Sequence, residues 1–270
     1  MRSILLHIDH DEGLEARLQA ALDLARAFEG HVTCLQTISF DVAVPGDLYG
    51  SMIAELVPVL RENADKLRDR TTARLDSEDV SWNWVQEEGS VRSQLLYREA
   101  LADVVVMGTH DPAGGRAPSA LTGDVAVHGR TPVLVVPESA RSLGLGGPAL
   151  VGWNGSTEAA NALRAAVPLL ARASSVVLAT VTGEPGTRDF DLPPVEGAEY
   201  LARHGIGCEM VELPLRDDSA ARTLALAAAA RTASLLVVGA YGHARAIETL
   251  FGGVTRDLFG DPPVPVFASH

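Results

Sequence analysis

The chain has 270 residues and carries 22 basic and 35 acidic side chains, which gives a net charge of −13. This acidity argues against a nucleic-acid partner, because phosphate backbones are held by clusters of Lys and Arg. Apolar residues make up 47% of the sequence and aromatic residues only 5%. The core must therefore be aliphatic, as in a parallel β-sheet covered by helices on both faces.

In chain order, short apolar runs alternate with segments of helical periodicity, which predicts a repeated β-α pattern. Five strands are expected in the first half, near residues 2–8, 31–38, 80–87, 103–108 and 132–136. Five more are expected in the second half, near residues 148–153, 175–182, 207–213, 234–239 and 264–268. Such alternation favours right-handed crossovers. We predict an α/β fold of two tandem doubly wound, Rossmann-like domains, each with a five-stranded parallel sheet.

The two halves repeat one another in sequence. The run "ADVVVMG" matches "ASLLVVG", and the offset between the halves is 145 residues at the first strand and 131 at the last two. The first half therefore carries 14 extra residues in its middle, which fit the long region 40–75. A linker rich in Gly, Ser and Pro at 137–148 separates the halves. We predict domains at 1–138 and 147–270.

The sequence shows little sign of targeting or of a disulfide framework. The start "MRSILLHIDHDEG" has one Arg and a short apolar run before charges begin, unlike a signal peptide. The Ala-rich run of the second half is interrupted by Arg231 and predicts a helix followed by a strand, not a membrane span. Cys34 and Cys208 each lie in an apolar, strand-like run, which is typical of a reduced protein. We expect cytoplasmic localisation and no membrane partner.

A glycine-rich segment follows the fourth expected strand of the second half. Gly239 and Gly242 are separated by two residues, and after nine more residues Gly252 and Gly253 precede Thr255 at the start of a helical stretch. Glycine lets the backbone approach a ligand closely, and a helix N-terminus offers unpaired N–H groups to a phosphate. The segment therefore predicts a phosphate-binding loop. Tight turns and close packing also explain such glycines, and this alternative stays open.

The segment "VVGAYGHARAIETLFGGVTRDLF" resembles the signature of the universal stress protein family, and the resemblance covers nearly the whole chain, twice over. Nucleotide-binding members carry G-x2-G-x9-G-S/T after strand four, where the glycines and the hydroxyl residue hold the phosphates of ATP. The resemblance implies an adenine-nucleotide-hydrolase-like fold and assigns Gly239, Gly242 and Gly252 to the phosphate loop. Gly253 stands where the family has Ser or Thr, and Thr255 supplies a hydroxyl two residues later.

The resemblance also implies contacts for the ribose and the adenine. Asn154 stands where the family has an Asp after strand one, and an amide can hydrogen-bond a ribose without charge assistance. Val181 is implied as the backbone contact for adenine. In the first half, Asp111 and Asp124 stand in the loop and would repel phosphates. We predict that this loop is degenerate, although Asp9 matches the family's strand-one acid.

Other kinds of site are disfavoured. His7, Asp9 and Asp11 alternate along "HIDHDE" and suggest metal ligands, but polar residues where a strand leaves the sheet explain them better, so we predict no metal site. The chain lacks G-x-S-x-G and H-E-x-x-H, and it lacks G-x-G-x-x-G after its first strand. Lys66 is the only lysine and follows no glycine-rich loop, which excludes a Walker-type loop.

The last strands of the two halves, 132–136 and 264–268, are expected at sheet edges. The resemblance implies that this strand pairs with its copy in another domain, and an unpaired edge strand is an association hazard. We hypothesise that the halves pair through these strands as an internal pseudo-dimer, and that self-association of the protein uses the same strands. The alternative is two sheets that merely touch.

The resemblance therefore implies a stress-response binding or signalling module that holds ATP or another adenine nucleotide in its second half. No catalytic residue is assigned, and any ATP hydrolysis is expected to be slow because no positioned base is found. The alternative is a nucleotide-independent scaffold or chaperone-like interaction protein, which the departures at Gly253 and Asn154 favour. An enzyme that uses an unrecognised pocket is a third, weaker alternative.

Overall fold

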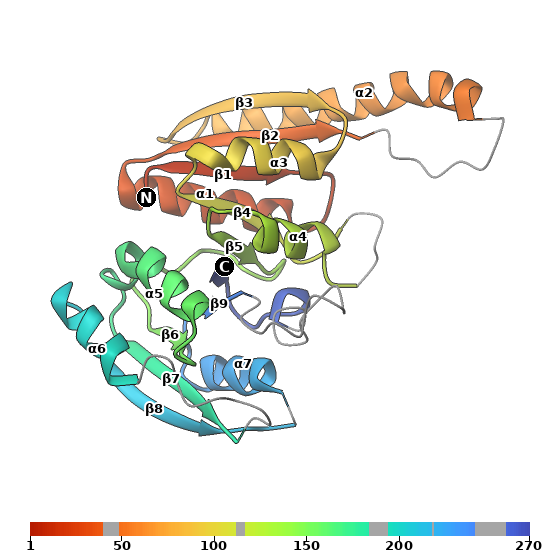
Figure 1. Cartoon of the computed structure of the whole chain (residues 1–270). Coiled ribbons are helices and arrows are strands. Elements are labelled where there is room, and N and C mark those ends of the chain that lie inside the picture. The colour runs from red at the N-terminus through yellow and green to blue at the C-terminus, as the bar shows by residue number, and fades with distance from the viewer. Residues whose placement is uncertain (40–48, 112–116, 184–193, 218, 241–257) are drawn as a thin grey trace.

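In a computed structural model, the chain forms one ten-stranded sheet with helices on both faces (Figure 1). The structure describes residues 1–39, 49–111, 117–183, 194–217, 219–240 and 258–270. Strands and helices alternate along both halves, so the predicted α/β class is confirmed.

The elements of the first half are β1 (Ser3–Ile8), α1 (Leu14–Phe28), β2 (His31–Ile38), α2 (Tyr49–Leu75), β3 (Ser81–Glu88), α3 (Val91–Arg98), β4 (Val104–Gly108), α4 (Ala120–His128) and β5 (Val133–Val136). Those of the second half are β6 (Ala149–Gly152), α5 (Thr157–Leu170), β7 (Val176–Thr182), α6 (Pro194–Arg203), β8 (Glu209–Pro214), α7 (Ala220–Ala230), β9 (Leu235–Gly239) and β10 (Val266–Ser269). Every one of these strands begins and ends within two residues of its predicted range.

The strand order is β3-β2-β1-β4-β5-β10-β9-β6-β7-β8. Within each half all five strands are parallel, and the order is the same when read from the outer edge inwards. The halves meet at an antiparallel pair in which Phe267 of β10 is opposite Leu134 of β5. The edge strands of the two halves therefore pair within the chain, and β5 and β10 each have a partner strand on both sides.

The sheet buries apolar side chains on both faces, as expected for a parallel sheet. Alternate residues of a strand point to opposite faces, so Leu134 and Val136 of β5 join one core while Val133 and Val135 join the other. Helices α1, α2, α5 and α6 cover the first face, and α3, α4 and α7 cover the second (Figure 1). Each core runs through both halves, because the ten strands form one continuous sheet.

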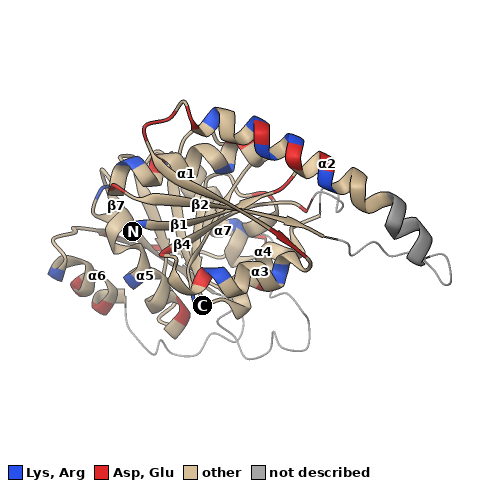
Figure 2. Ribbon diagram, turned by 90° about the horizontal axis from the view of Figure 1, so that it is seen from above, with Lys and Arg blue, Asp and Glu red and all other residues tan. Residues whose placement is uncertain are grey.

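The two halves differ in the length of the helix that follows their second strand. α2 has 27 residues and α6 has 10, in agreement with the extra length predicted in the first half. Acidic and basic side chains alternate along α2 (Figure 2), and they pair within it, as Lys66 does with Glu62 and Arg68 with Asp65. These pairs mark a solvated helix face and contribute little to stability singly.

Contacts between the halves also involve the linker and the ends of α1 and α5. The backbone N–H of Leu143 donates to Asp23 Oδ2 at 2.8 Å. The guanidinium of Arg172 donates to the carbonyl oxygen of Ala27 and lies 4.7 Å from the centroid of the Phe28 ring. Arg172 thereby satisfies one of the free carbonyls at the C-terminus of α1.

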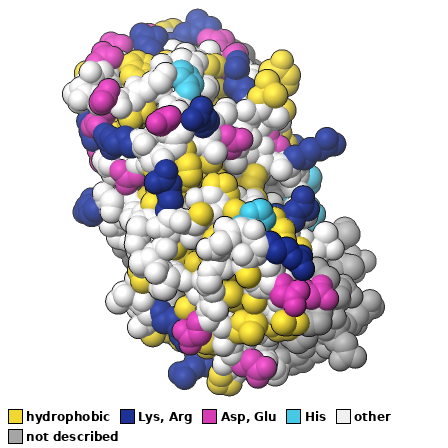
Figure 3. Space-filling model, turned by 90° about the vertical axis from the view of Figure 1, so that its left-hand side faces the viewer, with side chains coloured by type: hydrophobic (Ala, Val, Ile, Leu, Met, Phe, Trp, Pro, Cys, Tyr) yellow, Lys and Arg dark blue, Asp and Glu magenta, His cyan; other side chains and the backbone are white. Residues whose placement is uncertain are grey.

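On the face shown in Figure 3, acidic and basic side chains are interspersed among apolar ones, so neither sign dominates that face. Among the described residues, no helix has the length and apolar composition needed to cross a bilayer.

Candidate functional site

The carboxyl ends of β6, β7 and β9 lie side by side, because β6 pairs with β7 on one side and with β9 on the other. The order of the strands reverses at β6, and ligands of doubly wound sheets bind at such a reversal. Three predicted site residues belong to these strand ends: Asn154 lies two residues after β6, Val181 is the last residue but one of β7, and Gly239 is the last residue of β9. The other four, Gly242, Gly252, Gly253 and Thr255, lie outside the described residues.

Asn154 is exposed and begins the turn into α5. Its Oδ1 accepts a hydrogen bond from the N–H of Ser156 at 3.1 Å, and the Ser156 hydroxyl caps α5 by accepting from Ala159 N at 3.2 Å. The amide Nδ2 of Asn154 makes no hydrogen bond to any described residue. The Asn154 side chain can therefore donate to a ligand while its oxygen holds the turn.

The backbone N–H and C=O groups of Val181 point towards the side of β7 on which β6 lies, at a level that β6 no longer reaches. The carbonyl of Ala179 accepts from Trp153 N at 2.8 Å, which is the last bond of the β6–β7 ladder. Residues two apart in a parallel strand direct their N–H and C=O groups to the same side. The N–H and C=O of Val181 therefore point to the side where β6 has ended, as a backbone contact to a ligand would require.

Gly239 packs directly against the first turn of α5. A Cβ at this position would lie 2.5 Å from the nitrogen of Ala159 and 2.7 Å from the carbonyl carbon of Glu158. No side chain fits at that distance, so the close approach of β9 to α5 requires glycine. Its identity is thus explained by packing, whether or not a ligand binds next to it.

The equivalent end of β1 in the first half is filled by the side chain of Arg17. Arg17 is 1% exposed and forms a bidentate pair with Asp11, with N–O distances of 2.8 and 2.6 Å. Its Nε donates to the carbonyl oxygen of His7 at 3.2 Å. A Cβ on Gly108 would lie 2.5 Å from Arg17 Nη1, so Gly108 makes room for this guanidinium.

Burial changes the titration of the side chains around this pair. Burial, followed by the positive charge of Arg17, lowers the pKa of His7 to about 3, so the imidazole is neutral. Burial also raises the pKa of Asp9, and the neighbouring carboxylates Asp11 and Asp111 act in the same direction. Asp9 is therefore a poorly solvated carboxylate among other carboxylates, an unfavourable setting for a phosphate.

A carboxylate of the protein itself occupies the N-terminus of α4. Asp111 accepts hydrogen bonds from the Ser119 hydroxyl and, at 2.9 Å, from the N–H of Ala120. The hydroxyl of Thr122 is turned inwards and donates to the carbonyl oxygen of Gly108 at 2.8 Å. Asp111 thus takes the place at a helix N-terminus that an anion would take.

Sequence analysis missed Arg17 and Thr122. An arginine beside Leu14 and Leu18 on the apolar face of α1 was a usable signal, since the second half has Ala162 at the position 145 residues later. Thr122 precedes Gly253 by 131 residues, so the first half retains a hydroxyl that the second half lacks. Neither feature of the sequence predicts the hydrogen-bond partner of Arg17 or Thr122, because those partners come from other segments of the chain.

Metal and thiol chemistry find little support in the described part of the chain. It contains no group of three or more His, Cys, Asp or Glu side chains placed to hold a metal ion. Burial raises the pKa of Cys34 to about 12 and raises that of Cys208 as well. Both thiols are therefore protonated at neutral pH and are poor nucleophiles.

The family model described as "Universal stress protein family" matches residues 1–137 and 147–270. A universal stress protein from Archaeoglobus fulgidus DSM 4304 has a similar structure, with 16% identity, a TM-score of 0.75, and coverage of 99% of this chain and 96% of that one. A functionally unknown protein from Pseudomonas aeruginosa PAO1 is also similar, with 16% identity, a TM-score of 0.61, and coverage of 99% and 92%.

At these identities the two structures establish a shared fold, not a shared ligand. No curated protein is similar enough in sequence to count as a match. The family model nevertheless covers both halves of the chain, and the fold agrees with it. The chain therefore belongs to the universal stress protein family and carries the domain of that family twice.

Proposed function

We propose that this universal stress protein is a stress-response binding module that holds an adenine nucleotide, with ATP as the expected ligand, in its second half. The observation that carries the proposal is the carboxyl end of β6. Among the described residues, no hydrogen-bond partner is found there for the β6-facing backbone groups of Val181 or for the amide nitrogen of Asn154, and Gly239 ends the neighbouring strand β9. The Val181 backbone can contact adenine, and the Asn154 amide nitrogen can donate to a ribose oxygen.

The difference between the halves supports binding in the second half rather than the first. Arg17 and Asp11 fill the end of β1, whereas residues 145 positions later are the small Ala162 and Ser156. Ala162 is buried and carries no polar group that would close the site from below. We expect Gly242, Gly252, Gly253 and Thr255 to supply the phosphate contacts.

We further propose that the protein acts in the cytoplasm and signals by a ligand-dependent change at the segment after β9. Its cysteines are unpaired in the structure, as expected in a reducing compartment. Self-association through 132–136 and 264–268 would have to exchange these strands between chains, since each already has two partner strands within its own chain.

The test has two readouts on the purified protein. Nucleotide released by denaturation is identified, and a thermal melt is run with and without ATP. A site filled at 100 times its Kd raises the free energy of unfolding by about 2.7 kcal/mol. Gly252→Asp should abolish the shift by placing a carboxylate in the phosphate loop. Gly146→Asp is the charge-matched control, because a side chain at Gly146 meets no atom within 4 Å.

A scaffold or chaperone-like function is the second candidate, and the packing of Gly239 on α5 favours it. That glycine is required by the fold alone, so its presence does not demand a ligand. The absence of both released nucleotide and an ATP-induced shift at millimolar ATP would overturn the nucleotide proposal and favour the scaffold function, which a search for protein partners then tests. Turnover of ATP above that of Gly252→Asp would indicate an enzyme.

A further inference from the structure

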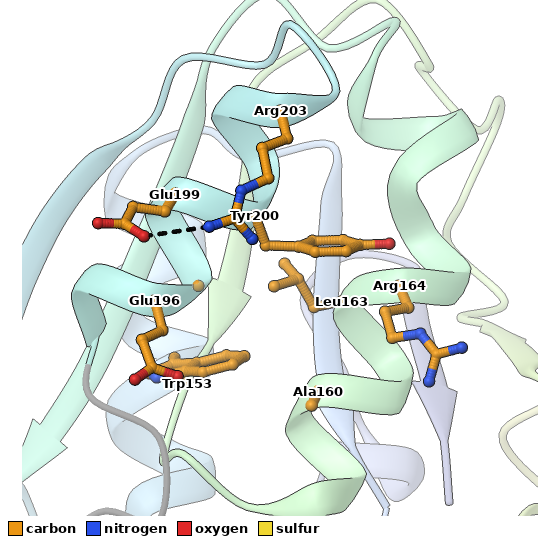
Figure 4. A pocket seen from close by; sticks show the side chains of 9 residues that line it. Trp153, Ala160, Leu163, Arg164, Glu196, Glu199, Tyr200 and Arg203 are labelled. Carbon is orange, nitrogen blue, oxygen red and sulfur yellow. Dashed lines mark hydrogen bonds and ion pairs between the residues drawn. The ribbon is translucent and has the colours of Figure 1, made fainter.

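A cavity of about 420 Å³ lies between α5 and α6 (Figure 4). The rings of Trp153 and Tyr200 and the side chain of Leu163 line it. Trp153 is 4% exposed, and the Tyr200 ring is supported by His204 at a centroid distance of 4.7 Å. Cavities of about 300–1,000 Å³ with aromatic and apolar linings are typical small-molecule sites.

The approach of α6 to the Trp153 ring depends on Gly197. A Cβ there would lie 3.3 Å from two atoms of the Trp153 ring and 3.2 Å from Leu178, tighter than most side-chain contacts. Glycine at this position lets the helix lie against the ring, while Glu196 and Tyr200 line the cavity beside it. The cavity is thus formed by a short helix seated closely on an aromatic ring.

The first half has polar side chains at the corresponding positions. Glu15 and Gln19 precede Ala160 and Arg164 by 145 residues. Both contact Arg74 of the long helix α2, each at 3.5 Å. In the second half these α5 positions line the cavity instead. The residues that line the cavity therefore differ from those at the same positions of the first half.

Four charged side chains line the cavity, and all four are exposed. Arg203 and Glu199 form an ion pair along α6 at 3.3 Å. Arg164 of α5 and Glu196 of α6 form no hydrogen bond or ion pair within the part of the chain that the structure describes. Figure 4 shows the two on opposite sides of the cavity. An aromatic-lined space is therefore flanked by one free positive and one free negative charge.

We propose that this cavity binds a small aromatic zwitterion, a molecule with a planar ring, a carboxylate and an ammonium group. The Arg164 guanidinium matches a carboxylate, because its parallel N–H groups fit two oxygens. Glu196 accepts from the ammonium group. The ring packs against Tyr200 and Trp153, where aromatic pairs are favoured.

This site is separate from the nucleotide site proposed above. Its lining contains none of Asn154, Val181 and Gly239, and its two Arg and two Glu side chains carry no net charge that would attract the several negative charges of ATP. A zwitterion has no net charge, and the exposed side chains of Arg164 and Glu196 would turn inwards to meet its two groups, which share one carbon. The two proposals can therefore fail independently, and ATP should not compete for the cavity.

Ligand-observed NMR on the full-length protein, with binding constants from titration, tests the proposal. The probes are L-phenylalanine, L-tyrosine and L-tryptophan at millimolar concentration, together with two analogues of phenylalanine. 3-Phenylpropanoate lacks the ammonium group, and phenethylamine lacks the carboxylate. We expect the amino acids to bind, each analogue to bind about tenfold or more weakly, as expected for loss of one charge-assisted contact, and ATP to leave binding unchanged.

Single-charge variants should separate the two contacts. Arg164→Gln should weaken the binding of L-phenylalanine about tenfold. It should leave the binding of phenethylamine unchanged, because that analogue has no carboxylate for Arg164 to contact. Glu196→Gln should weaken the binding of L-phenylalanine and leave the binding of 3-phenylpropanoate unchanged, because 3-phenylpropanoate has no ammonium group for Glu196 to contact. Arg231→Gln at the end of α7, on the other face of the sheet, and Glu12→Gln in the first half are controls with the same charge change and should bind as the unmodified protein does.

Ala160→Phe provides the test of location, because it fills the cavity from the α5 side. It should abolish binding of all three amino acids and preserve any thermal shift with ATP. The proposal is overturned if none of the amino acids binds, if Ala160→Phe binds them unchanged, or if ATP displaces them.

Discussion

Arg17 and Asp11 form a bidentate ion pair at the carboxyl end of β1, where the second half has Ala162 and Ser156. The arginine is 1% exposed, so its charge is balanced by Asp11 rather than by water. Removing one partner of a buried pair leaves an uncompensated charge, which costs far more than the pair contributes while intact.

Asp11→Ala should therefore lower the free energy of unfolding by about 3 kcal/mol, measured by urea denaturation at neutral pH. The loss comes from the isolated Arg17 guanidinium and from the hydrogen bond that Asp11 Oδ1 accepts from Gly13 N at 2.8 Å in the turn before α1. The double variant Asp11→Ser with Arg17→Ala copies the second half and should be more stable than Asp11→Ala. A loss below about 1 kcal/mol in Asp11→Ala would show that Arg17 finds water or another partner.

His7 makes stability depend on pH below its unfolded pKa. Its pKa falls from 6.5 to about 3 on folding, mainly because of burial and next because of Arg17, while Asp11 opposes the shift. At pH 7 the imidazole is neutral in the folded protein and mostly neutral in the unfolded chain. As the pH falls from 6.5 towards 3, the unfolded chain takes up a proton that the folded protein does not, so the folded state loses stability.

We expect His7 to contribute up to about 1.4 kcal/mol of lost stability for each pH unit within that window. Urea denaturation at pH 7, 6, 5 and 4 checks this against His7→Gln. The free energy of unfolding of His7→Gln should fall less steeply with decreasing pH than that of the unmodified protein, whatever the absolute stability of the variant. Equal slopes in the two proteins would mean that His7 titrates in the folded state with an ordinary pKa.

The fold was predictable because each of its determinants is local. Apolar runs such as "ADVVVMG" and its copy "ASLLVVG" mark buried parallel strands, and the helices between them show regular periodicity. The repeat then fixed the same strand order in both halves. The pairing of β5 with β10 was expected from the family resemblance and from the need of an edge strand for a partner, whereas its antiparallel direction was not predicted.

The site was less predictable because its determinants come from distant segments. Gly239 was interpreted as part of a phosphate loop, yet it meets the backbone of Ala159, about 80 residues earlier. Arg17 lies on an apolar helix face, and only the turn after β1 supplies its partner Asp11. The cavity beside Trp153 needed the length of α6 and the position of Gly197, which no motif encodes.

Gly239→Ala separates packing from ligand binding. The added methyl group would lie 2.5 Å from the Ala159 nitrogen, so β9 or α5 must shift. Overpacking of this kind costs about 1–3 kcal/mol. The free energy of unfolding in urea, measured without nucleotide, should fall by that amount.

Gly146→Ala is the matched control, since its added methyl group meets nothing within 4 Å, and its stability should stay within about 0.5 kcal/mol of the unmodified protein. A Gly239→Ala protein of unchanged stability would return the glycine to a role in ligand binding alone.

Removal of residues 261–270 tests the pairing of the halves. The deletion takes away β10, whose Val266, Phe267 and Ala268 are buried between β5 and β9. Both neighbouring strands then present free N–H and C=O groups along an apolar edge, which recruits strands from other chains. Size-exclusion chromatography with light scattering should show aggregates or strand-exchanged dimers. Deletion of His270 alone leaves the ladder intact and should not change the elution volume. A truncated protein with unchanged apparent mass and solubility would mean that the two halves are held together by the α1–α5 contacts, with β10 contributing little.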